Sequence, residues 1–264
     1  MTNGSLADLL FKAKKRPLWE ERVRIALEVA RGIYYLHQEC EVHIIHCNLK
    51  PENILMDDTW TAKISNFGLA GLSVPNQTRT TMGIEGTSGY SAPEWQKNAL
   101  ISVKADIYSF GVMLLEIVCC RSNIEVNVST ADEILLSSWV YNCFVVGELD
   151  KLVEEENVDM KTLERMVKVG LWCIQEDPAL RPPMKNSGYQ QGSSKEHDRL
   201  EDDLKLIGEA QNFEEGTRVE NERVQKGVAK GRSCSSTFKN GGGEKELELT
   251  GFEVVGQRWR QYRI

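Results

Sequence analysis

The chain has 264 residues, of which 41% are hydrophobic, which is enough for one sizeable core. Its formal net charge of -7 at pH 7 argues against general binding to nucleic acid, because affinity for a phosphate backbone requires clustered lysine and arginine. Seven cysteines, with neither a C-x-x-C pair nor the spacing of a zinc site, predict buried thiols in a reducing compartment.

The sequence predicts a cytoplasmic chain without a membrane segment. No apolar stretch approaches the roughly 20 residues that span a bilayer, and residues 1–10 lack the basic and apolar regions of a signal peptide.

The first half of the chain predicts one helix followed by short strands. Residues 18–37 carry apolar or small side chains at helical spacing, with His37 on the inward face. Three short apolar runs separated by polar segments then predict strands at Val42–Ile45, Ile54–Met56 and Ala62–Ile64.

The second half predicts three helices and then a change of composition. Residues 103–119 are apolar on nearly every face, which indicates a central buried helix. Residues 131–146 and 161–175 give two more helical patterns, which end before Pro178. We therefore expect a folded domain over residues 1–184. Residues 185–264, rich in Gly, Ser, Glu, Lys, Gln and Asn, are expected to be a disordered tail.

Three motifs carry the chemistry of the sequence. The run H-C-N-L-K-P-E-N at residues 46–53 resembles the catalytic loop H-R-D-L-K-P-x-N of protein kinases. Ser65-Asn66-Phe67-Gly68 follows where the magnesium-binding D-F-G is expected, and Ala92-Pro93-Glu94 closes the activation segment. The chain thus resembles the protein kinase family.

Further runs narrow this resemblance to plant receptor-like serine/threonine kinases with G-type lectin, or S-locus, ectodomains. These runs are Asn3-Gly4-Ser5-Leu6, Asn76-Gln77-Thr78-Arg79-Thr80, Gly89-Tyr90, Pro93-Glu94-Trp95 and Leu171-Trp172-Cys173-Ile174. The resemblance implies a mainly α fold, the C-terminal lobe of a kinase with a few short strands. It also implies family members anchored in the plasma membrane by an upstream segment, with the kinase domain on the cytoplasmic side.

The resemblance also assigns structural roles to four residues. Asp106 would hold the catalytic loop from the central helix, and Glu94 would pair with Arg181. His46 would be a scaffold residue of the loop and not a general base.

Two departures from the family pattern predict a loss of activity. Asn48 stands where the family has the Asp that accepts the substrate hydroxyl proton, and an amide is no base near neutral pH. Asn66 replaces the Asp of D-F-G, so the magnesium positions Asn53 and Asn66 offer only neutral oxygens. Lys50 keeps the place from which it would steady the transferred phosphate.

The cofactors implied by the family are ATP and Mg²⁺, and we expect their binding to be weak or absent. No G-x-G-x-x-G followed by V-A-x-K occurs in the 264 residues, so we expect that the N-terminal lobe, with its nucleotide-binding loop, is missing. Three threonines in the activation segment are expected phosphorylation sites or, equally, parts of a solvated loop: Thr78, Thr80 and Thr81.

Three hypotheses for function follow. The chain is an inactive kinase lobe that binds another kinase or signalling protein, an ATP-dependent serine/threonine kinase with residual activity, or a pseudogene product that does not fold. The tail from Lys185 onward is either a shifted reading frame or mis-joined exon, or a lineage-specific extension.

Overall fold

The computed structural model describes residues 1–72, 89–96, 101–125, 133–153 and 157–184 with their side chains. It also describes the backbone of two strands, β5 (Ser235–Asn240) and β6 (Gly243–Glu248). The chain divides into two compact units, Met1–Glu209 and Ala210–Ile264.

The first unit is mainly helical. Its helices are α1 (Trp19–Tyr34), α2 (Val103–Cys119), α3 (Leu136–Val146) and α4 (Met160–Cys173). Its strands are β1 (Ile44–Ile45), β2 (Ile54–Met56), β3 (Ala62–Ile64) and β4 (Gly71–Leu72). Among the described residues, no helix combines the length and the apolar character needed to cross a membrane.

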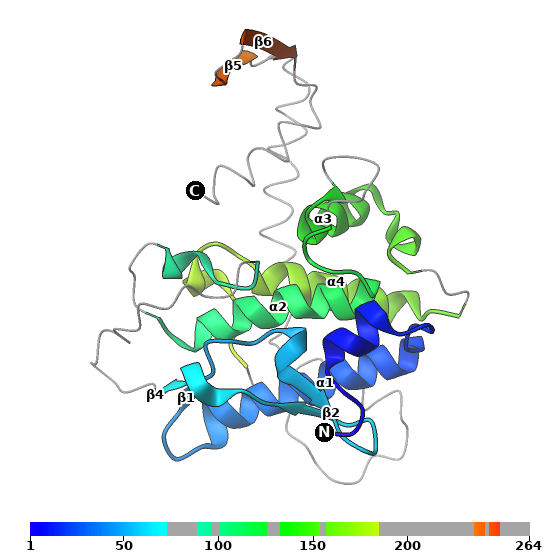
Figure 1. Ribbon diagram of the computed structural model, residues 1–264, viewed down its shortest axis with the longest axis vertical. Helices are drawn as coiled ribbons and strands as arrows, with labels where there is room; N and C mark the ends of the chain where they lie inside the picture. The colour runs from blue at the N-terminus through cyan, green and yellow to red at the C-terminus, as the bar shows by residue number, and fades with distance from the viewer. Residues whose placement is uncertain are drawn as a thin grey trace. The chain divides into compact units, whose positions relative to one another are not determined.

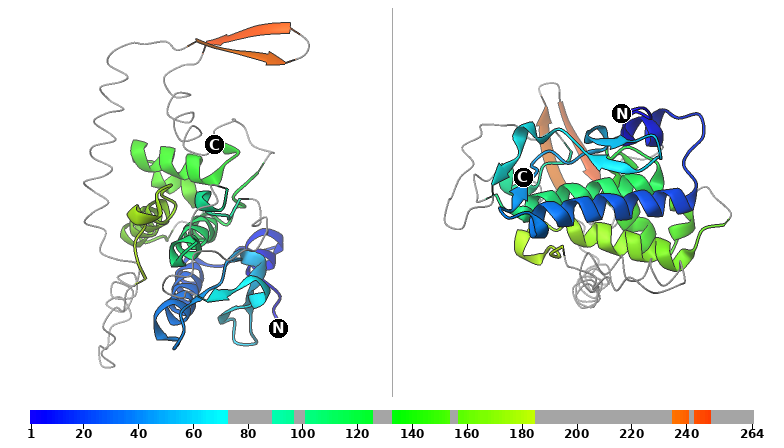
Figure 2. Two further views of the ribbon diagram at one scale, coloured as in Figure 1. Left: turned by 90° about the vertical axis from the view of Figure 1, so that its left-hand side faces the viewer. Right: turned by 90° about the horizontal axis from the view of Figure 1, so that it is seen from below.

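Helix α2 is the centre of the core. Its N-cap is Ser102, whose hydroxyl accepts a hydrogen bond from the Lys104 N–H, and every residue from Ala105 to Cys119 is buried. It lies between α1 and α4 and also contacts α3, as Figures 1 and 2 show. A helix apolar on nearly all faces requires such cover on several sides, so the prediction of a buried central helix is confirmed.

Helices α2 and α4 approach closely because each carries a glycine at the contact. A Cβ atom on Gly111 would lie 2.5 Å from Cys173 Cβ and 2.9 Å from the Gly170 carbonyl oxygen. A Cβ atom on Gly170 would lie 2.5 Å from Leu115 Cδ2. Real carbon atoms do not approach so closely, so the pair of glycines sets the separation of the two helices.

The strands of the first unit form two small antiparallel pairs. In the first, Ile54 of β2 lies opposite Ile64 of β3, and the chain start joins its edge because the Met56 N–H donates to the Gly4 carbonyl at 2.9 Å. In the second, Ile44 of β1 lies opposite Leu72 of β4. Because Ile54 lies opposite Ile64, the segment that precedes β2 and the segment that follows β3 lie beside one another.

The predicted elements agree with the structure except at their ends. The helix predicted over residues 18–37 is α1, continued by a π-helical turn over Tyr35–Glu39. The prediction of a strand at Val42 and His43 was wrong, because only Ile44–Ile45 pairs, with β4. Strand β4, which is only two residues long, was not predicted.

The second unit contains one described feature. Strands β5 and β6 pair antiparallel, with Ser235 opposite Glu248 and Asn240 opposite Gly243. They lie within the segment, residues 185–264, that is predicted to be a disordered tail. The rest of residues 185–264 lies outside the described residues, and the prediction for it stays a prediction.

We predict that Gly111→Ala lowers the free energy of unfolding by about 1 to 3 kcal/mol, the usual cost of overpacking a core. The added methyl group meets a Cβ atom and a backbone oxygen, neither of which can rotate away. Urea unfolding followed by circular dichroism measures the change.

Gly32→Ala is the matched control, since it adds the same methyl group to a helix. Its new Cβ atom would lie 2.7 Å from Ile64 Cδ1, the end of a flexible side chain. We therefore expect a smaller loss, and equal losses in the two variants would contradict the close approach of α2 and α4.

Candidate functional site

The buried carboxylate of Asp106 organises the catalytic loop, residues 46–53. Its Oδ2 accepts a hydrogen bond from the His46 backbone N–H at 2.7 Å, and its Oδ1 accepts one from the Cys47 N–H at 2.9 Å. The His37 Nε2 atom lies 2.9 Å from Oδ2. Asp106 and His37 are each 1% exposed. The first residues of the loop are thus fixed to α2 by charge-assisted hydrogen bonds.

The role of His37 was not predicted from the sequence, which placed this residue on the inward face of a helix without a partner. The pattern did contain an indication, because His37 falls on the inward face of the helical pattern. A histidine buried on an apolar face requires a polar partner, and that partner is Asp106.

The imidazole of His46 is fully engaged in holding the loop. Its Nε2 lies 2.8 Å from the Ser65 carbonyl oxygen, and its Nδ1 accepts a hydrogen bond from the Asn48 N–H at 3.2 Å. This combination fits a neutral ring with the proton on Nε2. The ring also meets the Phe67 ring edge-on at 4.9 Å. His46 therefore links the catalytic loop to residues 65–67 and has no nitrogen left to take a substrate proton.

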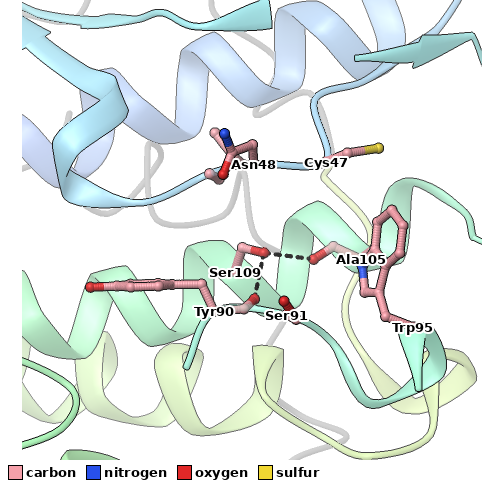
Figure 3. Close-up of a pocket in the computed structure, with 8 residues that line it drawn as sticks. Cys47, Asn48, Tyr90, Ser91, Trp95, Ala105 and Ser109 are labelled. Carbon is pink, nitrogen blue, oxygen red and sulfur yellow. Dashed lines mark hydrogen bonds between the residues drawn. The ribbon is translucent and has the colours of Figure 1, made fainter. Parts of the chain in front are cut away.

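Asn48 lies in a hollow between the catalytic loop and the segment before Pro93. The hollow is lined by Cys47, Asn48, Leu49, Tyr90, Ser91, Trp95, Ala105 and Ser109. Figure 3 shows Cys47 and Asn48 on one side of it and the segment bearing Tyr90, Ser91 and Trp95 on the other. A substrate hydroxyl presented here would meet the amide of Asn48 and not a carboxylate.

The floor of this hollow is anchored to α2. The Ser109 hydroxyl donates to the Tyr90 carbonyl at 2.8 Å and lies 3.2 Å from the Ala105 carbonyl, as the dashed lines in Figure 3 indicate. The position of the Tyr90 backbone is thereby set by the central helix.

Asn53 and Asn66 contact each other directly. The Asn53 Nδ2 donates to the Asn48 carbonyl at 2.7 Å, and its Oδ1 accepts from the Asn66 Nδ2 at 3.1 Å. Ser65 adds two bonds to the Asn53 carbonyl, from its N–H at 2.9 Å and its hydroxyl at 2.8 Å. Lys50 precedes them with an extended backbone, at the start of the short 3-10 helix Pro51–Asn53.

These residues do not fit a Mg²⁺ ion. Magnesium prefers anionic oxygens in octahedral geometry, whereas position 66, where the family has a carboxylate, carries a neutral amide. The oxygen of Asn53 that would face a metal already accepts a hydrogen bond from Asn66. Within the part of the chain that the structure describes, no group of three His, Cys, Asp or Glu side chains is placed to hold a metal.

Cys47 is not a reactive thiol. It is partly buried with a left-handed backbone, φ +65°. Burial, helped by the negative charge of Asp106, raises the pKa of the Cys47 thiol to about 12, so it stays protonated at neutral pH.

A bidentate ion pair joins the end of the activation segment to the end of the lobe. The Arg181 Nη1 and Nη2 atoms lie 2.7 Å from Glu94 Oε1 and Oε2. Arg181 is 1% exposed, lies over the Tyr108 ring, and donates to the Gln175 carbonyl at 2.7 Å. The pair therefore holds the turn at Pro93–Trp95 against α2.

A third buried acidic side chain, Glu116, binds the same segment. Both of its oxygens accept from the Tyr90 hydroxyl, at 2.7 and 2.9 Å, and Oε1 also accepts from the Asn123 N–H at 2.7 Å. No role was predicted for Glu116, although a carboxylate in the middle of a largely apolar helix requires a polar partner. Burial raises the pKa of Glu116 to about 8 and also raises that of the Tyr90 phenol.

The structure thus brings together seven of the predicted site residues in two clusters. His46, Asn48, Asn53, Asn66 and Asp106 are linked by hydrogen bonds, and Glu94 pairs with Arg181. The expected phosphorylation sites Thr78, Thr80 and Thr81 lie outside the described residues.

The fold and this site define a protein kinase lobe, and comparison with known proteins agrees. The model of the family described as "protein kinase domain" matches residues 1–189. The chain therefore belongs to the protein kinase family.

Curated proteins similar to this chain are receptor-like serine/threonine kinases of plants. Over 187 residues it is 56% identical to the rice (Oryza sativa subsp. indica) G-type lectin S-receptor-like serine/threonine-protein kinase LECRK1, a match covering 70% of this chain and 23% of that protein. The LECRK4 protein of Oryza sativa subsp. japonica is 52% identical over 185 residues, 69% of this chain and 23% of the relative. RLK1 of Arabidopsis thaliana is 50% identical over 189 residues, 70% of this chain and 22% of the relative. The matched lobe is thus a kinase domain of the receptor-like serine/threonine kinase family and spans less than a quarter of these relatives.

We predict that Asp106→Asn lowers the free energy of unfolding by about 1 to 3 kcal/mol, the cost of leaving a buried donor without an acceptor. The new amide has one oxygen to serve the three donors that the two carboxylate oxygens serve now. Urea unfolding detects the loss.

Asp57→Asn is the matched control for Asp106→Asn. In that turn a single oxygen, Oδ1, accepts from the Thr59 N–H, the Thr59 hydroxyl and the Thr61 N–H, and an asparagine keeps it. We expect little change, and equal sensitivity of the two positions would argue against the role given to Asp106.

A second prediction concerns pH. The folded pKa of Glu116, about 8, exceeds its ordinary value of 4.5, so the folded chain binds more protons than the unfolded chain between these values. The free energy of unfolding due to this group therefore falls as the pH rises through that window. Glu116→Gln keeps an acceptor for Tyr90 and Asn123 but does not titrate. Between pH 6 and pH 8, which lies between the two pKa values, its melting temperature should therefore fall less than that of the wild type.

Glu20→Gln, at an exposed carboxylate of α1, controls for the removal of a charge. Equal pH dependence in the wild type and Glu116→Gln would show that Glu116 does not titrate in this window.

Proposed function

We propose that this kinase lobe acts as a protein-binding module and does not transfer phosphate. The observation that carries the proposal is that positions 48, 53 and 66 all bear amides, so that the site lacks the two carboxylates on which the family's chemistry depends. Within the protein kinase family, those carboxylates accept the substrate proton and bind the metal.

In the protein kinase family, the carboxylates at these two positions account for a large part of the lowering of the activation barrier. General base catalysis contributes roughly 10²- to 10⁴-fold, or about 3 to 5 kcal/mol of barrier lowering. Asn48 supplies none of this, and loss of the metal-binding carboxylate at Asn66 acts in the same direction. The family uses ATP and Mg²⁺, and we propose that both bind this chain weakly.

A preserved scaffold supports a binding role. Asp106, the Glu94–Arg181 pair and the Tyr90–Glu116 contact all form although the catalytic carboxylates are replaced. In the described residues, no buried side-chain nitrogen or oxygen lacks a hydrogen-bond partner, which favours a folded lobe over a product that fails to fold. We propose as partner another kinase or signalling protein in the cytoplasm, since the relatives are named receptor-like kinases.

Residual ATP-dependent phosphotransferase activity is the second candidate. Lys50 and Asn53 keep the residue types of the family loop, and the loop keeps its attachment to α2. The two functions differ in whether any phosphate is transferred.

A phosphorylation assay separates them. The full chain, and a fusion of it to the upstream kinase portion of the rice LECRK1 relative, are incubated with radiolabelled ATP, Mg²⁺ and a generic protein substrate. We expect incorporation at background in both. In the fusion, Asn48→Asp together with Asn66→Asp should raise incorporation by at least about 10²-fold, the lower bound for a restored base.

Asn48→Ala in the unrepaired fusion is the control. Magnesium-dependent transfer by the unrepaired fusion that disappears in Asn48→Ala would falsify the proposal and establish the second candidate.

A further inference from the structure

The hydrogen bond between Asn66 and Asn53 occupies the place where kinases hold a metal. Asn53 is 6% exposed, and its amide orientation is set by the Asn48 carbonyl, which accepts from its Nδ2 at 2.7 Å. Because a carbonyl only accepts, the Asn53 Oδ1 must point the other way, toward Asn66. The group that faces the Asn53 Oδ1 atom must then be a hydrogen-bond donor or a cation. Here it is the Asn66 Nδ2 atom, at 3.1 Å.

The backbone narrows which residue meets this need. Residue 66 has φ +64° and ψ +60°, a left-handed conformation that glycine, asparagine and aspartate adopt most readily. Glycine has no side-chain donor, and an ionised aspartate would set an acceptor against the acceptor of Asn53. Asparagine alone among the three both adopts this backbone and donates.

Residues 65–67 have further attachments to the catalytic loop. Ser65 donates twice to the Asn53 carbonyl, and its own carbonyl lies 2.8 Å from the His46 Nε2. The amide bond of Asn66 completes a set of contacts that contains no ion. It lies at the end of the set nearest solvent, since Asn66 itself is exposed.

We propose that the Asn66 side-chain amide replaces the divalent cation as the bridge between the catalytic loop and residues 65–67, so that this site is ordered without metal. The inference deepens the proposed function, because it shares the replacement at position 66, but it does not require that phosphate transfer be absent. As a consequence, Mg²⁺ does not bind the folded chain more tightly than the unfolded chain, so it does not change the free energy of unfolding.

Thermal unfolding of the full chain in excess magnesium chloride or in EDTA tests the proposal. We expect the wild type to melt at the same temperature in both. Asn66→Asp should melt lower in EDTA, because two acceptors then face each other. Magnesium should recover at least about 2 to 4 °C, the usual response of a domain of this size to a single modest interaction.

Two matched variants complete the design. Asn66→Gly keeps the left-handed backbone without the donor, so it should melt lower than the wild type by a similar amount in both solutions. Gln38→Glu makes the same amide-to-carboxylate change at an exposed position outside the site, and it should respond to magnesium as the wild type does.

Two outcomes would overturn the inference. One is a wild-type melting temperature that rises with magnesium as much as that of Asn66→Asp. The other is an Asn66→Gly variant as stable as the wild type in EDTA. Phosphate transfer is a separate readout, so a wild type that transfers phosphate yet melts independently of metal refutes the proposed function and leaves this inference standing.

Discussion

The Asp106 carboxylate is the interaction on which the site depends. It is buried in α2 and satisfied by two backbone N–H groups and one imidazole, so the start of the catalytic loop has a single position relative to the core. The His46 imidazole in turn hydrogen-bonds to the Ser65 carbonyl, and the Ser65 hydroxyl donates to the Asn53 carbonyl. An uncompensated carboxylate at this depth would be costly, so the loop and the helix stabilise each other's placement.

The residues that hold the fold together differ from those at the positions of the family's catalytic and metal-binding carboxylates. The groups that hold the loop and the activation-segment end are Asp106, Glu116, Glu94 and Arg181, all in the interior. The positions that would perform proton and metal chemistry, 48 and 66, face the hollow or solvent. Amides at positions 48 and 66 therefore leave the first set of contacts intact, so the fold does not depend on carboxylates at these two positions.

Much of this could be predicted from the sequence, for physical reasons. The apolar pattern of residues 103–119 predicted the burial of α2, and the resemblance of the motifs to protein kinases predicted which polar residues would gather around the loop. The pairing of Glu116 with Tyr90, and of His37 with Asp106, could not be obtained from either, since an apolar pattern shows which residues are buried but not which polar partner each one meets. The bond from Asn66 to Asn53 also depends on how two amides are oriented, which a one-dimensional pattern does not contain.

The ion pair between Glu94 and Arg181 has a consequence for how the lobe is made. Its partners are separated by 87 residues, and Arg181 also ties down the carbonyls of Gln175 and Glu176. A ribosome releases the chain from its N-terminus onward, so α2 and the catalytic loop emerge long before the guanidinium that secures the activation-segment end. During synthesis the buried Glu94 carboxylate therefore stays without its partner until residue 181 has left the exit tunnel.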